Sequence, residues 1–81
     1  MSYMEELKEK LVPQLSKLGI KILPKGQSLR LVKDMKIVMT LEDKGEYIEM
    51  KYEGKTYKYD KWYTKPEHLA PVVIRQFEKK E

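Results

Sequence analysis

Apolar side chains recur every three or four positions near the start of the chain, at Met4, Leu7, Leu11, Leu15 and Leu18. This spacing predicts an amphipathic helix that buries one stripe. Ser2 and Glu5 have the spacing of a capping box at its start, and Gly19 is suited to end it. Pro13 falls inside this helix and removes one backbone hydrogen bond. We therefore expect a kink there or two shorter helices.

The hydrophobic period changes to two in the middle of the chain. Three consecutive stretches alternate apolar and polar side chains, and the turn signals Asp43-Lys44-Gly45 and Glu53-Gly54 separate them. This alternation predicts an antiparallel meander over residues 35–60. The side chains expected on its buried face are Ile37, Met39, Leu41, Ile48, Met50, Tyr57 and Tyr59.

Tight turns would fix the register of this meander. If Glu53-Gly54 is a two-residue loop, the expected pairs are Tyr52 with Lys55, Met50 with Tyr57, Ile48 with Tyr59, and Glu49 with Lys58 on the other face. If Lys44-Gly45 is the other loop, the expected pairs are Leu41 with Ile48, Met39 with Met50, and Ile37 with Tyr52. Both loops place the same apolar set on one face.

Two shorter strands are expected upstream, at residues 20–22 and 28–32, with the turn signal Pro24-Lys25-Gly26 between them. A two-residue loop at Lys33-Asp34 would turn the apolar side chains of the second strand to the wrong face. We therefore expect a bulge or a longer turn where this strand joins the meander.

A second helical stripe follows the meander, formed by Leu69, Ala70, Val73, Ile74 and Phe77. Pro71 interrupts it, so the regular helix is expected to begin there, after one short turn over residues 66–69. The sequence therefore predicts a single α+β domain over residues 1–81. Its antiparallel sheet of three to five strands has the N-terminal and C-terminal helices packed on one face.

Composition narrows the class of protein. The 81 residues include no cysteine, which excludes a disulfide framework, a thiolate metal site and a cysteine nucleophile. No signal-peptide pattern and no apolar run long enough to span a bilayer is present, so we expect a soluble, cytoplasmic protein with no membrane partner. The lysine- and glutamate-rich, asparagine-free composition is also typical of hyperthermophile proteins.

Candidate chemistry is sparse. His68 is the only histidine, and we expect it to be an exposed polar residue near a helix start rather than a metal ligand. The serines have no nearby base, and the glycines fall at turns rather than in a phosphate-binding cluster. We therefore expect no enzyme activity, no metal, no cofactor and no small-molecule substrate.

The net charge of +4 is unevenly distributed. Residues 17–36 hold six basic side chains against one acid, and residues 55–65 hold four against one, whereas residues 42–54 are acidic overall. If the two basic segments meet in space, they form a positive patch that could follow a phosphate backbone. The alternative is that lysines and glutamates simply alternate on solvated faces.

Aromatic side chains are interleaved with the second basic segment. Strand alternation assigns Tyr52, Tyr57 and Tyr59 to the core. It leaves Tyr47, Trp62 and Tyr63 for an exposed stacking platform. For Trp62 we favour a packing role, as a plug between the last strand and the following helix. The residues predicted to bind DNA or RNA are Lys21, Lys25, Arg30, Lys33, Lys36, Lys55, Lys58, Lys61, Trp62, Tyr63 and Lys65.

A protein-interaction module is the competing hypothesis. The outer face of the meander mixes both signs of charge with Tyr47, which suits a protein partner or self-association through that face or an edge strand. The order helix, three strands, helix resembles double-stranded RNA-binding domains in outline. However, residues 64–68 replace the Gly- and Lys-rich turn of that family, so no family is assigned.

Overall fold

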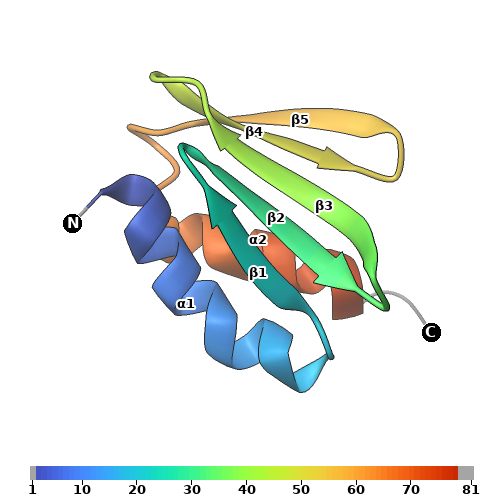
Figure 1. Cartoon of the computed structure of the whole chain (residues 1–81). Coiled ribbons are helices and arrows are strands. Elements are labelled where there is room, and N and C mark those ends of the chain that lie inside the picture. Colours follow the sequence, from blue (N-terminus) through green and yellow to red (C-terminus); the bar gives the residue numbers. More distant parts are fainter. Residues whose placement is uncertain (1, 79–81) are drawn as a thin grey trace.

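The computed structural model describes residues 2–78 and confirms the predicted α+β class (Figure 1). Its elements follow one another along the chain as α1 (Tyr3–Lys17), β1 (Lys21–Lys25), β2 (Ser28–Lys33), β3 (Lys36–Asp43), β4 (Tyr47–Tyr52), β5 (Lys55–Asp60) and α2 (Pro66–Glu78). The five strands form one antiparallel sheet in the order β1-β2-β3-β4-β5. The sheet therefore reaches the upper end of the predicted range.

Both ends of α1 have the predicted caps. The Ser2 hydroxyl accepts from the Glu5 amide at 3.2 Å, while the Glu5 carboxylate accepts from the Ser2 amide at 3.0 Å. Gly19 adopts a positive φ of 77°, and the Ile20 amide folds back to the Leu15 carbonyl at 2.9 Å. The helix continues through Pro13 as one element, so the prediction of two shorter helices is wrong. Burial of the leucine stripe outweighs the lost hydrogen bond.

The hairpin between β4 and β5 has the predicted register. Met50 lies opposite Tyr57 and Glu49 opposite Lys58, around a two-residue turn at Glu53 and Gly54. Both turn residues have positive φ, at 52° and 78°, as a tight hairpin requires.

The hairpin between β3 and β4 corrects the predicted register by two residues. Leu41 lies opposite Met50 and Met39 opposite Tyr52. The last ladder pair is Asp43 with Ile48, so the loop between them is two residues longer than expected, and the Lys44 amide donates to the Tyr47 carbonyl at 2.9 Å within it. A register shift of two residues leaves each side chain on the same face of the sheet. The predicted and observed buried residues of this hairpin therefore agree, although their cross-strand partners differ.

The expected irregularity between β2 and β3 is a bulge. The register shifts at Leu31 and Val32, which leaves Val38 as the extra residue on β3. The bulge restores the buried face for the second strand, where Leu31 is fully buried. It also turns Ile37 outward, with 55% of its surface exposed, so the prediction that Ile37 belongs to the core is wrong.

Both helices cover one face of the sheet (Figure 1). The α2 helix runs without interruption from Pro66, so the predicted start at Pro71 is also wrong. Its stripe of Leu69, Ala70 and Val73 joins the leucines of α1 and the inward strand residues in one core. No helix of the described residues covers the opposite face of the sheet, called the outer face below.

Candidate functional site

The two ends of the sheet differ in what they contain. The turns at residues 26–27 and 44–46 and the connection at residues 61–65 lie at the end where both helices begin, called the junction end (left in Figure 1). The turns at residues 34–35 and 53–54 lie at the opposite end, called the hairpin end.

The predicted binding residues are divided between these ends. The hairpin end has Lys21, Lys33, Lys36 and Lys55; the junction end has Lys25, Lys61, Trp62, Tyr63 and Lys65; Arg30 and Lys58 lie between them on the outer face. Each end therefore combines lysines from both basic segments, and the predicted residues do not gather at a single place. Among residues 2–78, lysines lie beside exposed aromatic rings at the junction end only.

The connection between β5 and α2 presents two aromatic rings to solvent. Trp62 is 77% exposed and Tyr63 is 86% exposed. Asp60 organises the segment, because one carboxylate oxygen accepts from the Trp62 amide at 2.7 Å and from the Tyr63 amide at 3.2 Å. The predicted packing role of Trp62 is therefore wrong, since its backbone is fixed here while its ring stays out of the core.

Lys61 fixes the same connection to the turn between β3 and β4. Its ammonium contacts both carboxylate oxygens of Asp43, at 2.9 and 3.1 Å, and lies 5.6 Å from the centre of the Tyr3 ring. The other donor to Asp43 is the Gly45 amide at 2.8 Å. The side chains of Lys61 and Asp43 are only 25% and 12% exposed. The ion pair thus ties the β3–β4 turn to the residue next to Trp62, and Lys61 is already neutralised.

Two further lysines lie over aromatic rings near this end. The Lys65 ammonium is 5.6 Å from the Trp62 ring centre, and the Lys58 ammonium is 5.3 Å from that of Tyr47. Tyr47 lies opposite Asp60 in the ladder, so its ring is on the outer face next to the connection. Both lysines are exposed. The site therefore combines accessible π surfaces with exposed positive charges.

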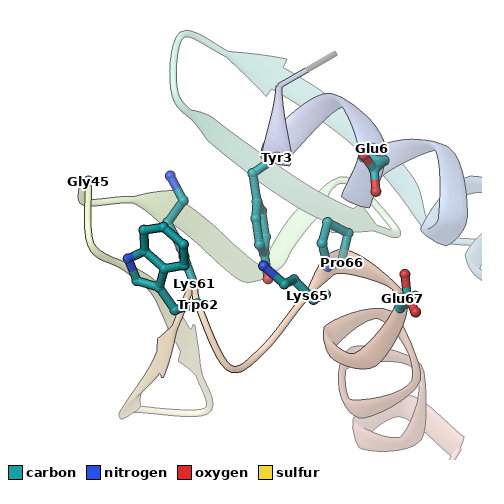
Figure 2. A pocket seen from close by; sticks show the side chains of 8 residues that line it. All are labelled: Tyr3, Glu6, Gly45, Lys61, Trp62, Lys65, Pro66 and Glu67. Carbon is teal, nitrogen blue, oxygen red and sulfur yellow. The ribbon is translucent and has the colours of Figure 1, made fainter.

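A groove lies between the Trp62 ring and the two helices. It has a volume of about 710 Å³, with Trp62 on the connection side and Tyr3 on the α1 side (Figure 2). Glu6 and Glu67 line its helix side. The Tyr3 hydroxyl donates to the Thr64 carbonyl, and burial, with the charges of Asp43 and Glu6, raises the pKa of Tyr3 to about 12. Tyr3 is therefore a neutral structural donor at physiological pH.

The outer face is more mixed. Arg30, Thr40, Lys51 and Thr56 form one row across four strands that contains no acid. The next row contains Glu42 and Glu49, which lie opposite each other. Lys51 is 3.8 Å from Glu49 and partly neutralises it. Without exposed aromatic rings along these rows, the outer face alone offers phosphate contacts but little stacking surface.

The remaining features concern the histidine, metal binding and membrane spans. His68 is exposed in the first turn of α2, as predicted. Among residues 2–78, no three His, Asp or Glu side chains cluster as metal ligands, and neither helix has the length and apolar character to cross a membrane.

Comparison with known proteins yields no assignment: no protein-family model matches the chain, and neither a curated protein nor a solved structure is significantly similar to it. The functional assignment therefore depends on the site itself.

Proposed function

We propose that the protein binds single-stranded nucleic acid at its junction end. The observation that carries this proposal is the exposure of Trp62 and Tyr63 on a connection that Asp60 and Lys61 hold in place. Large aromatic side chains contribute most to stability when buried. Two adjacent exposed rings on a hydrogen-bonded segment are therefore suited to contact a flat ligand.

Stacking supplies the sequence-tolerant part of the binding. An unpaired base can lie on the Trp62 ring, since every base has a π face, and alanine substitution of such a platform costs about 1–3 kcal/mol per base. The Lys65 ammonium now over that ring would then turn to a phosphate. Tyr63 offers a second surface one residue along the chain.

The charged side chains at the junction end determine the path of the bound nucleic-acid strand. Glu6 and Glu67 line the helix side of the groove and repel phosphates there. The connection carries Lys65 and the outer face of β5 carries Lys58; both are exposed and can each neutralise a phosphate. The sugar–phosphate backbone of the nucleic acid therefore runs from the connection toward the outer face. Lys61 remains paired with Asp43 and positions Trp62.

Fluorescence anisotropy of labelled single strands at about 50 and 200 mM salt tests this proposal. We expect Trp62→Ala to weaken binding about 5- to 150-fold, corresponding to about 1–3 kcal/mol. Lys65→Ala should lower the salt dependence by about one phosphate contact, roughly 0.7 in the slope of log K against log salt. Val12→Ala and Lys10→Ala, both exposed on α1, are the matched controls. Equal affinity for wild type and Trp62→Ala would exclude the platform.

A protein partner is the second candidate function. It is favoured by two apolar side chains on the outer face, Leu23 and Ile37, which are 51% and 55% exposed. Val32 lies beside them and is directly opposite Ile37. Such an interface would survive high salt and lose affinity on Leu23→Ala, whereas nucleic-acid binding at the junction end would be unchanged by that substitution.

A further inference from the structure

The turn between β2 and β3 has an unfavourable residue at its apex. Asp34 and Met35 both have positive φ, at 52° and 66°. Tight hairpin turns of this kind prefer glycine at the second position, because a Cβ atom is strained in the left-handed region. The neighbouring turn, Glu53-Gly54, has glycine at the corresponding place. Met35 thus carries a conformational cost that glycine would avoid.

Packing within the chain does not offset this cost. Met35 is 97% exposed, the highest value among the large exposed apolar residues of the described chain. Its thioether side chain therefore contributes little to the core while straining the backbone. Because the strained conformation of Met35 gains no packing within the chain, we expect its side chain to contact a ligand outside the chain.

The charge around Met35 is basic on balance, with three lysines against the carboxylate of Asp34 in the turn itself, and this balance favours an anionic ligand. Lys33 and Lys36 are paired directly behind the turn, and both are exposed. Lys21 lies opposite Val32, one ladder position further from the apex. A symmetric contact between two copies of this tip would bring these lysines together, which disfavours self-association.

The narrow shape of the turn between β2 and β3 favours a step between two base pairs, rather than a protein surface, as the ligand of Met35. A stable protein interface buries about 800 Å² on each partner, and a two-residue turn with one apolar side chain is too narrow to supply it. Proteins that deform duplexes insert single apolar side chains, including methionine, between neighbouring base pairs. Lysines on either side of such a wedge can reach the adjacent phosphates.

We propose that Met35 is a wedge that enters a base step of a nucleic-acid duplex, with Lys33 and Lys36 on the flanking phosphates. The proposal rests on the class of ligand proposed above, but it uses the opposite end of the sheet. The insertion kinks the duplex, since the separated step opens on the side of the wedge.

A DNA duplex of about 20 base pairs, labelled at both ends for energy transfer, tests this wedge. Wild-type protein should shorten the end-to-end distance, and both Met35→Ala and Met35→Gly should abolish the change. Met35→Gly should also raise Tm by several degrees because it relieves the strain, whereas Met35→Ala retains the strained φ. Val12→Ala, which removes exposed apolar surface from α1, should bend the duplex like wild type.

Anisotropy with single strands separates this inference from the proposed function. The Met35 variants should bind single strands as wild type does, and Trp62→Ala should still bend the duplex. An unbent duplex with wild-type protein, or equal bending by wild type and Met35→Gly, would overturn the wedge. Met35-dependent pelleting with phosphatidylserine vesicles, without duplex bending, would overturn it in favour of a lipid surface.

Discussion

Removing the carboxylate of Asp43 should destabilise the junction end more than any ordinary surface substitution. Asp43→Ala deletes an ion pair with Lys61 at 2.9 Å and a hydrogen bond from the Gly45 amide at 2.8 Å. The pair is three-quarters or more buried, with 25% and 12% exposure, so water screens it weakly. Hydrogen bonds to charged groups contribute about 1.5–3 kcal/mol. We expect the free energy of unfolding to fall by about 2–3 kcal/mol, which lowers Tm by roughly 8–24 °C in a domain of this size.

Urea denaturation followed by circular dichroism measures this loss in a double-mutant cycle of Asp43→Ala and Lys61→Met. A largely buried pair should show a coupling of at least about 1 kcal/mol between the two side chains. The pair between Glu42 and Lys44 is the matched control, since it is 3.3 Å long but 43% and 38% exposed, and its coupling should stay below about 0.5 kcal/mol. A coupling near zero for Asp43 and Lys61 would refute the anchoring role.

Three other substitutions test the fold. Pro13→Ala should raise the free energy of unfolding by about 1–3 kcal/mol, because it restores a helical hydrogen bond in α1; urea midpoints check this. Leu41→Ala, at a fully buried site, should lower it by about 2–5 kcal/mol in the same assay. Tyr3 keeps its proton in the folded state up to about pH 12, against an ordinary pKa of 10.0. Above pH 10 the unfolded chain loses this proton first, so the stabilisation is complete below pH 10 and declines toward pH 12. Urea midpoints between pH 9 and 11.5 should therefore fall less steeply for Tyr3→Phe than for wild type.

The sequence predicted which side chains of a strand face the core better than it predicted which residues pair across neighbouring strands. Alternation assigned Met39, Leu41, Ile48 and Met50 to the core because burial fixes the parity of a strand. The β3–β4 register was missed because a loop longer by two residues leaves every face unchanged. Parity also required an irregularity between β2 and β3, but it did not show that Ile37 would be the residue turned outward.

The candidate site was harder to predict for a different reason. The backbone around Trp62 is held by Asp60, whose carboxylate accepts from the amides two and three residues ahead. The sequence segment Asp60-Lys61-Trp62-Tyr63 contains this signal, since aspartate commonly caps such turns. The pairing of Lys61 with Asp43 spans 18 positions and depends on the register of two hairpins, which no local pattern reveals.

The fluorescence of Trp62 offers the most direct test of nucleic-acid binding at the junction end. Trp62 is the only tryptophan of the chain and is 77% exposed, so its emission reports on the proposed platform alone. Titration with unlabelled single strands at about 50 mM salt should quench this emission, and about 200 mM salt should weaken the effect. Unchanged emission at concentrations where anisotropy shows the strand bound would place the ligand elsewhere and contradict the account.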